Sequence, residues 1–344
     1  MSLPFDPPLE PMLARAAPEI PREGRWLYEP KWDGFRAVVF RDGANVHIAS
    51  RNALALERYF PELIQPLQAA LPDRSIVDGE VVIATEHGLD FGALQQRIHP
   101  AASRVRMLSE KTPASVVLFD LLALDADDLR ERPLQERRAG LMQAIASSRT
   151  VGVTPQTDDP DEATTWFTRY EGAGLDGVVA KDPAGTYRPG ERRWVKVKHL
   201  RTVDTVVGGY RIAKDGRGIG SLLLGLYDSD GQLHHVGHTS SFDAAERRAI
   251  LEQLQPLVGG DSFEHGRTPG GPSRWQRSAD SAWTSVRPEL VCEVSFDHLQ
   301  SGRFRHASRF LRWRPDKAPR SCDFDQLSPP EEFSLDDILV TPGA

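Results

Sequence analysis

Apolar and polar residues follow two patterns in the first 200 residues of the chain. Short apolar runs rich in Val, Ile, Leu and Phe predict strands, and longer amphipathic stretches, two of which open on proline, predict helices. The predicted strands are 37–40, 46–49, 76–83, 116–121, 177–180 and 194–198, and the predicted helices are 61–70, 91–98, 134–146 and 160–171. Their alternation predicts an α+β domain with a mixed sheet.

After residue 200 the pattern changes to closely spaced apolar runs. These predict strands at 205–210, 221–227, 233–236 and 290–296, with one helix at 243–254. Such spacing is typical of a small barrel that carries one helix. Residues 259–281 are rich in Gly, Pro, Ser and Arg and predict a long surface loop. We therefore expect two domains, residues 1–200 and 201–344.

The composition is that of a globular protein, since 40% of the 344 residues are hydrophobic and 26% are charged. No apolar run approaches the roughly 18 residues of a membrane span, and residues 1–23 lack the basic start and apolar stretch of a secretory signal. We expect a cytoplasmic protein without membrane contact. Two cysteines, Cys292 and Cys322, are too few for a disulfide framework or a four-cysteine zinc site.

The net charge of -7 argues against a protein that coats nucleic acid without specificity. Basic residues nevertheless gather with aromatic ones in two segments, 187–201 and 303–320, as a phosphate-contacting surface requires. Acidic residues gather near the C-terminus and predict a solvated and partly ordered tail. They are Asp323, Asp325, Glu331, Glu332, Asp336 and Asp337.

One six-residue run, Lys31-Trp32-Asp33-Gly34-Phe35-Arg36, combines a lysine with a glycine-containing turn that can present it. A lysine amine attacks the α-phosphate of a nucleoside triphosphate only after it loses a proton, and its ordinary pKa is about 10.4. Neighbouring cations, a bound metal or loss of water would favour the neutral amine. The run alone fits a solvated strand end equally well, so nucleotidyl transfer requires further lysines or carboxylates.

Two predicted strands carry such groups on one face. In strand 76–83, alternation puts Asp78 and Glu80 on one face and apolar residues on the other. In strand 194–198, Lys196 and Lys198 turn to one side, where they can hold a triphosphate. Each strand, considered alone, could also be an exposed edge whose charges are solvated.

The order of these segments resembles that of the covalent nucleotidyltransferases, a superfamily of DNA ligases, RNA ligases and mRNA capping enzymes. The run at Lys31 resembles the nucleotide-accepting motif. The segments that resemble the other motifs follow in order: Ser50-Arg51-Asn52, Asp78-Gly79-Glu80, Val117-Leu118-Phe119-Asp120, Asp176-Gly177-Val178-Val179-Ala180-Lys181, Lys196-Val197-Lys198 and Arg314-Pro315-Asp316-Lys317. Together they span nearly the whole chain.

Longer runs resemble one branch, the ATP-dependent DNA ligases, particularly the compact bacterial repair enzymes and the ligase modules of end-joining proteins. These runs lie at 29–30, 89–97, 129–138 and 187–190. The resemblance implies an N-terminal adenylation domain of mixed and antiparallel sheets with helices, followed by a C-terminal OB-fold β-barrel with the acidic tail. It also implies that ATP binds between the domains and that the OB-fold helps to close over DNA.

The resemblance also implies roles for individual residues. Lys31 would carry AMP, Asp33 would position its loop and Arg51 would contact the nick phosphate. The residues that would bind the nucleotide are Glu29 near the exocyclic amine of adenine, Phe119 stacked on adenine, Arg36 and Glu80 at the ribose, Lys196 and Lys198 at the α-phosphate, and Lys181.

The remaining implied roles concern metal and pyrophosphate. Glu80 and Asp176 would hold Mg²⁺, with Mn²⁺ as a second possibility, and Asp316 with Lys317 would orient pyrophosphate when the OB-fold closes. Asp176 stands where the superfamily usually has glutamate. Its side chain reaches about one methylene less far, and a bridging water could compensate.

The implied reaction moves AMP from ATP to Lys31 and then to the 5′-phosphate of a nick in double-stranded DNA, where the 3′-hydroxyl displaces it. We expect a monomer that acts in DNA repair, and the sequence identifies no repair partner. An RNA ligase or a capping-type guanylyltransferase remains an alternative, distinguished by the nucleotide and the acceptor. A non-catalytic nick-binding OB module is disfavoured by the intact lysine and carboxylates.

Overall fold

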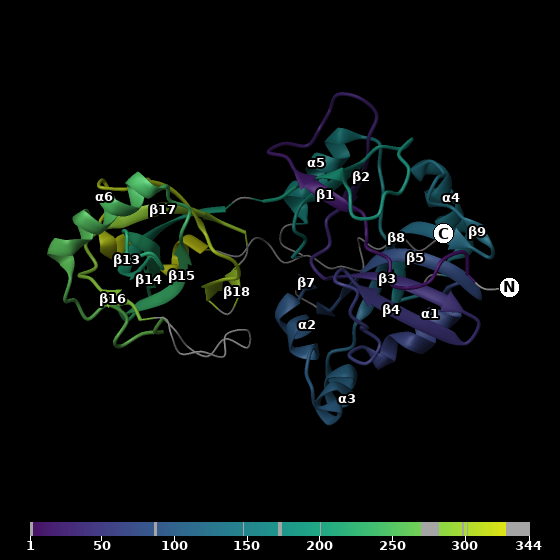
Figure 1. Cartoon of the computed structure of the whole chain (residues 1–344), viewed down its shortest axis with the longest axis horizontal. Coiled ribbons are helices and arrows are strands. Elements are labelled where there is room, and N and C mark those ends of the chain that lie inside the picture. Colours follow the sequence, from purple (N-terminus) through teal and green to yellow (C-terminus); the bar gives the residue numbers. More distant parts are fainter. Residues whose placement is uncertain are drawn as a thin grey trace. The chain divides into compact units, whose positions relative to one another are not determined.

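The computed structural model describes residues 3–327 except 86–87, 147, 171–173, 200, 270–281, 298 and 301. The chain divides into two compact units on either side of residue 200 (Figure 1). Each unit has its own sheets and its own buried core.

The N-terminal unit is built on a sheet in the order β10-β8-β5-β3-β4, with the short β9 on β8. Its pairs are antiparallel except for β10, which runs parallel to β8. The strands are β3 (Phe35–Asp42), β4 (Asn45–Ser50), β5 (Arg74–Val82), β8 (Ser115–Leu124), β9 (Asp127–Asp128) and β10 (Val151–Val153). β5 therefore lies in the interior of the sheet.

A second sheet of this unit has the order β1-β12-β11-β2. Its strands are β1 (Leu13–Ala16), β2 (Leu27–Pro30), β11 (Val178–Lys181) and β12 (Arg192–Val197), and only β1 and β12 are parallel. Side chains from the two sheets, including Val38, Phe119 and Trp194, share one buried cluster. The two sheets therefore pack face to face, and this places β11 and β12 near β8.

Helices surround these sheets (Figure 1). They are the 3-10 turn η1 (Pro61–Leu63), α1 (Ile64–Ala70), α2 (Phe91–Arg97), α3 (Ala102–Lys111), α4 (Leu134–Ala144) and α5 (Pro160–Arg169). Two short strands, β6 (Ala84–Thr85) and β7 (Gly88–Leu89), pair with each other. The strands and helices predicted for this half are confirmed, apart from shifts at their ends. The pattern missed β1, β2, β10, α3 and the two-residue strands β6, β7 and β9.

The C-terminal unit is a curved antiparallel sheet in the order β15-β14-β13-β17-β20. Its strands are β13 (Arg201–Ile212), β14 (Ile219–Tyr227), β15 (Leu233–Thr239), β17 (Val291–Phe296) and β20 (Arg309–Trp313). The outer strands approach each other, because Thr239 bridges Ser308 and its hydroxyl accepts the Phe310 N–H at 3.0 Å. The sheet thereby closes into a barrel, as its strand spacing predicts.

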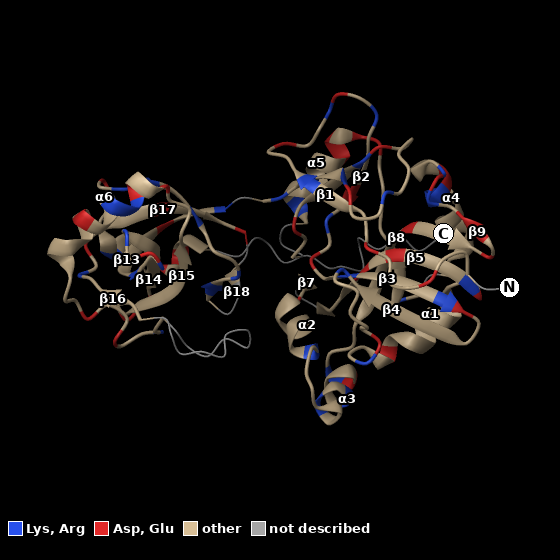
Figure 2. Ribbon diagram, in the orientation of Figure 1, with Lys and Arg blue, Asp and Glu red and all other residues tan. Residues whose placement is uncertain are grey.

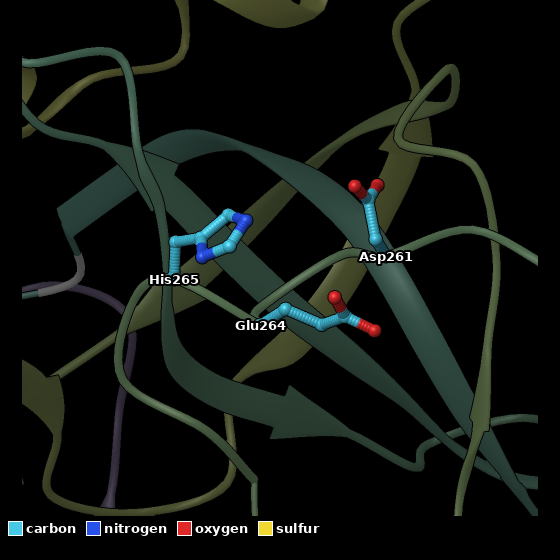
Figure 3. Close-up of side chains that lie close together, drawn as sticks. All are labelled: Asp261, Glu264 and His265. Carbon is cyan, nitrogen blue, oxygen red and sulfur yellow. The ribbon is translucent and has the colours of Figure 1, made fainter.

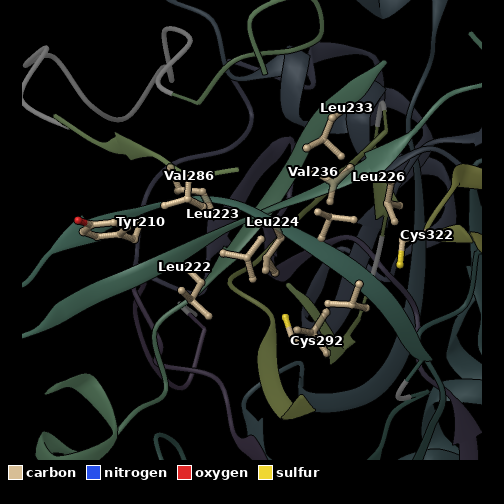
Figure 4. Close-up of a cluster of buried hydrophobic side chains, with 14 of the residues drawn as sticks. Tyr210, Leu222, Leu223, Leu224, Leu226, Leu233, Val236, Val286, Cys292 and Cys322 are labelled. Atoms are coloured by element: carbon tan, nitrogen blue, oxygen red, sulfur yellow. The ribbon is translucent and has the colours of Figure 1, made fainter. Parts of the chain in front are cut away.

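One long helix, α6 (Ala244–Leu254), accompanies the barrel and begins at a capping box formed by Asp243 and Glu246. The short elements are η2 (Gln255–Leu257), β16 (Thr284–Ser285), β18 (Leu299–Gln300), β19 (Arg303–Phe304), η3 (Pro319–Ser321) and η4 (Phe324–Leu327). Leucine and valine side chains fill the interior together with Cys292 and Cys322 (Figure 4). Both cysteines are free thiols.

One expectation for this unit needs correction. In the predicted surface loop, Phe263 is only 2% exposed and packs in the barrel core, so the loop is anchored there, although Asp261 and Glu264 beside it are exposed; residues 270–281 lie outside the described residues. Of the predicted acidic tail, Asp323 and Asp325 are described and ordered: Asp325 is exposed in η4, and the Tyr227 N–H donates to the Cys322 carbonyl at 2.9 Å. Its other acidic residues lie beyond the described part. No helix among the described residues is long and apolar enough to cross a membrane.

Candidate active site

Lys31 lies directly after β2, where the backbone joins two motifs that are far apart in sequence. The Lys31 N–H donates to the Gly177 carbonyl at 2.9 Å, and the Asp176 N–H donates to the Lys31 carbonyl at 2.8 Å. These bonds continue the β2–β11 ladder past the end of both strands. Gly177 has φ of +124°, and a Cβ there would lie 2.0 Å from the Val197 carbonyl. A side chain at this position is therefore excluded by β12.

A single buried carboxylate faces the lysines. Asp176, 3% exposed, lies with Oδ2 at 2.6 Å from Lys31 Nζ and at 2.7 Å from Lys198 Nζ. Lys196 lies on β12, two residues before Lys198. Burial and then the charges of Lys198 and Lys31 lower the pKa of Lys196. The structure therefore brings Lys31, Lys196, Lys198 and Asp176 together. To act as a nucleophile, the Lys31 amine must leave its ion pair and lose its proton.

Arg36 is fixed by a buried network. Its Nε and Nη2 donate to the two oxygens of Asp78 at 2.6 and 2.5 Å, and Nη2 also donates to the Met12 carbonyl at 3.1 Å. The Tyr187 hydroxyl donates to Asp78 at 2.6 Å and accepts the Met12 N–H at 2.9 Å. Burial disfavours the guanidinium charge, but Asp78 outweighs burial and raises the pKa of Arg36. Asp78 thus holds Arg36 and has no oxygen turned to solvent.

Glu80 lies two residues further along β5. Because β5 pairs with β3 and β8 on its two sides, the alternative of an exposed strand edge is wrong. Burial raises the pKa of Glu80 to about 7, against the lowering effect of Arg36 and Lys31. Its carboxylate makes no hydrogen bond or ion pair with the described residues. It is an oxygen donor of the kind that Mg²⁺ prefers.

Phe119 lies on β8 among charged and aromatic groups. It is 7% exposed. The Arg36 guanidinium lies 4.6 Å and Lys181 Nζ 4.5 Å from its ring centroid, and Trp194 meets it edge-on at 5.9 Å. Arg36 and Lys181 therefore already contact the ring on which a base would stack.

Glu29 is held by two side chains. It is 2% exposed, and its Oε2 lies 2.6 Å from Lys181 Nζ while its Oε1 accepts the Gln156 Nε2 at 2.7 Å. Burial lowers the pKa of Lys181, and Glu29 opposes that effect. Lys181 links Glu29 to the Phe119 ring.

The other predicted residues are Asp33, Arg51, Asp316 and Lys317, and of these Asp33 lies close enough for its charge to act on Glu80. Arg51 is exposed in the turn after β4, and Asp33 is half-buried beside Lys31 in the sequence. Asp316 and Lys317 belong to the C-terminal unit, where Arg314 donates to Asp316 at 2.8 Å and lowers its pKa to about 2. Lys317 Nζ lies 3.5 Å from Asp204.

In the predicted basic surface at 187–201, Arg192 and Arg193 at the start of β12 are exposed, whereas Arg188, Lys196, Lys198 and Arg201 are half-buried. Figure 2 shows Lys and Arg residues gathered near β1, the strand that pairs with β12. Two of its arginines are paired with acidic residues: Arg188 with Glu131 at 2.8 Å and Arg193 with Glu191 at 2.6 Å. Its net positive charge is therefore smaller than the sequence suggests.

Within the part of the chain that the structure describes, one group of three side chains has the spacing of a metal site. It consists of Asp261, Glu264 and His265 on the barrel, with ligand atoms within 4.8 Å of one another (Figure 3). All three are exposed, and none comes from the cluster around Lys31. We assign no metal to this group.

Sequence patterns gave no role to Tyr187, Trp194 or Gln156. Tyr187 and Gln156 form hydrogen bonds with Asp78 and Glu29, which lie more than a hundred positions away in the sequence. No local sequence spacing therefore indicates them. Trp194 lies two residues before Lys196 on the same predicted strand, and a tryptophan in step with the paired lysines was the available signal.

Comparisons with known proteins cover both units. The family model described as ATP dependent DNA ligase domain matches residues 11–198, and the one described as ATP dependent DNA ligase C terminal region matches residues 215–317. DNA ligase C of Mycobacterium tuberculosis is 52% identical over 98% of this chain and 99% of its own length. DNA ligase C1 of Mycolicibacterium smegmatis is 51% identical over the same shares. A solved Lig E DNA ligase structure has a TM-score of 0.52 at 17% identity, covering 88% of this chain and 99% of that chain.

Proposed function

Because the chain belongs to the ATP-dependent DNA ligase family and is an ATP-dependent DNA ligase, we propose that it seals nicks through AMP carried on Lys31. The observation that carries the proposal is the convergence of Lys31, Lys198 and Asp176, which come from separate motifs, at ion-pair distance. A nucleophilic amine beside a second cation and a carboxylate has the groups that nucleotidyl transfer needs.

In the first step, Lys31 Nζ bonds to the α-phosphorus of ATP and the bond to pyrophosphate breaks. A triphosphate offers Lys198 and Lys196 negative oxygens in place of Asp176, so its arrival would loosen the ion pairs that hold Lys31. Because phosphate oxygens replace the Asp176 carboxylate, the lysines keep an oppositely charged partner while ATP binds.

The nucleoside binds beside these lysines. Adenine would stack on Phe119 with its amine toward Glu29, and the ribose would lie against Arg36 and Glu80. Support comes from the contact of Lys181 with both Phe119 and Glu29 and from the rigid Asp78 pairing of Arg36.

Glu80 and Asp176 would hold Mg²⁺, or Mn²⁺ in its place. Both are carboxylates, and Glu80 is not engaged elsewhere in the described chain, so the donor set suits a hard divalent cation. When bound, the metal supplies positive charge that neutralises the phosphate oxygens. Asp176 would then contact the metal ion in place of one of its two lysine partners.

In the later steps AMP passes to the 5′-phosphate of a nick, and the 3′-hydroxyl then displaces it. We assign the nick-phosphate contact to Arg51, loop positioning to Asp33, and pyrophosphate orientation to Asp316 and Lys317 on the C-terminal barrel, which we take to be an OB-fold. We propose a monomer that acts in the cytoplasm in DNA repair.

The test is a pulse with α-labelled ATP and Mg²⁺ followed by unlabelled ATP and nicked duplex. We expect one label per chain, released as AMP when the nick closes, and no label in Lys31→Ala. Lys111→Ala, at an exposed lysine of α3, is the matched control and should behave as the unaltered protein. Sealing by Lys31→Ala would overturn the proposal. Labelling by GTP alone, or transfer to RNA only, would instead support the alternative activities.

A further inference from the structure

A short backbone bridge places Gln156 beside Glu29. The Tyr28 N–H donates to the Thr157 carbonyl at 2.8 Å, and the Thr157 N–H donates to the Tyr28 carbonyl at 3.1 Å. These bonds add residue 157 to the edge of β2 opposite β11. Gln156 and Glu29 are the next residues on either side of this bridge, so their side chains meet.

Thr154, two residues before Gln156, is held from two directions. Trp32, directly after Lys31, donates its indole N–H to the Thr154 hydroxyl at 2.8 Å. Arg138 of α4 donates to the Thr154 carbonyl, and this arginine is 8% exposed. Gln156 therefore extends from an anchored segment rather than from a free loop.

The amide of Gln156 can face Glu29 in only one orientation. A carboxylate accepts hydrogen bonds and has none to give, so the atom at 2.7 Å from Glu29 Oε1 is the amide nitrogen. The amide oxygen, Oε1, then points away from Glu29. No hydrogen bond within the described part of the chain reaches that oxygen. Gln156 therefore adds a second acceptor, one side chain away from the Glu29 carboxylate.

Two acceptors distinguish the two purine nucleotides. Adenine carries an amino group at C6, which donates hydrogen bonds, whereas guanine carries a carbonyl oxygen there, which accepts them. An amino group can bond to both acceptors, but a carbonyl oxygen would face a carboxylate and an amide oxygen with no proton between them.

We propose that Gln156 is a specificity-determining residue, which fixes the Glu29 carboxylate and supplies a second acceptor so that the enzyme selects ATP over GTP. The inference rests on the proposed function, because it needs the adenine edge to lie at Glu29. It adds a residue that no motif contains.

The test compares Gln156→Met with the unaltered protein. Methionine keeps the length of the side chain and removes both the donor and the acceptor. Single-turnover adenylate formation should show KM for ATP raised about 10- to 100-fold, the range for losing hydrogen bonds at a charged group. The maximal rate should change far less, and the preference for ATP over GTP should fall.

Two further variants separate the possible outcomes. Gln156→Glu keeps an acceptor but places like charge beside Glu29, and it should weaken ATP binding at least as much. Gln135→Met, at an exposed glutamine of α4, should change nothing.

An unchanged KM and unchanged selectivity in both Gln156 variants, with the unaltered protein labelled normally, would overturn this inference and leave the lysyl-AMP proposal intact. Absence of label in the unaltered protein would overturn the proposed function itself. A uniform loss of maximal rate accompanied by a lower melting temperature would show a merely structural role for Gln156, which also overturns the inference.

Discussion

Arg36 shows how much a single buried contact contributes at this site. Its guanidinium meets both oxygens of Asp78, which is 0% exposed. Lysine keeps the charge but cannot form the paired bonds, and it would leave Asp78 partly uncompensated. We expect Arg36→Lys to lower the free energy of unfolding of the N-terminal unit by about 2–4 kcal/mol.

Urea unfolding followed by tryptophan fluorescence measures this change. Arg74→Lys is the control, because Arg74 pairs with the exposed Asp125 and such pairs contribute at most about 1 kcal/mol. Equal effects of the two substitutions would show that the Asp78 network does not hold the fold.

His235 gives the C-terminal unit a pH dependence. Burial, assisted by the charges of Arg303 and Arg211, lowers the pKa of His235 to about 3, and neither ring nitrogen has a hydrogen-bond partner. In the unfolded chain the pKa is about 6.5. Between these values the unfolded state binds a proton that the folded state rejects, so stability is complete above pH 6.5 and falls on acidification.

We expect the C-terminal unit to lose about 2 kcal/mol of its free energy of unfolding between pH 7 and pH 5 through this residue. His235→Phe should remove that loss, and His306→Gln, at an exposed histidine, should retain it. Identical pH slopes for His235→Phe and the unaltered protein would contradict the assignment.

Residues in motifs were easier to predict than residues that support them. The meeting of Lys31 and Lys198 at Asp176 could be expected, because nucleotidyl transfer needs a lysine and a phosphate clamp at recognisable spacings. Strand alternation predicted that Asp78 shares a face and a function with Glu80. In the structure, Asp78 instead accepts hydrogen bonds from Arg36 and Tyr187. Gln156 carries no local signal, because its partner lies 127 positions away.

Among the elements, the junction of β2 with β11 fixes the backbone of Lys31, the proposed nucleophile. Gly177 adopts φ of +124° against the Val197 carbonyl, so alanine would force the ladder apart and move Asp176 away from Lys31. We expect Gly177→Ala to cost about 2 kcal/mol or more of stability and to slow adenylate formation at least about tenfold, since misplaced groups lose rate steeply.

Gly43→Ala is the matched control. Gly43 also has a positive φ, +59°, but a Cβ there meets nothing within 4 Å. Strain of about 1–2 kcal/mol should leave adenylate formation unchanged. If both variants form the adenylate at the normal rate, the β2–β11 junction does not position Lys31.

Long apolar runs predicted their elements well, and short ones did not. β5 and β8 were predicted because most of their residues are buried, and buried strands give long apolar runs in the sequence. β1 and β2 have four residues each, too few to show a period, and they exist because β11 and β12 pair with them. The glycine- and proline-rich surroundings of Phe263 predicted a surface position, but its side chain is buried in the barrel core.

At the scale of the whole molecule, we expect residues of the C-terminal unit to act in some steps of the reaction and not in others. Asp316 is held by Arg314 on the C-terminal unit, and we assign it to pyrophosphate, which leaves in the first step only. Asp316→Ala should therefore slow formation of the lysyl adenylate about tenfold or more, by loss of a positioning group.

Transfer of preformed AMP from Asp316→Ala to nicked duplex should proceed at the normal rate. Rapid-quench measurements of each step separate the two effects. A normal first step combined with a slow transfer would assign Asp316 to DNA instead.

The identity of the adenylated residue tests the central claim most directly. After incubation with ATP and Mg²⁺, peptide mapping by mass spectrometry should find one AMP per chain, on the peptide that contains Lys31, and nicked duplex should remove it. AMP on another residue, or strand sealing without any covalent adenylate, would contradict the account.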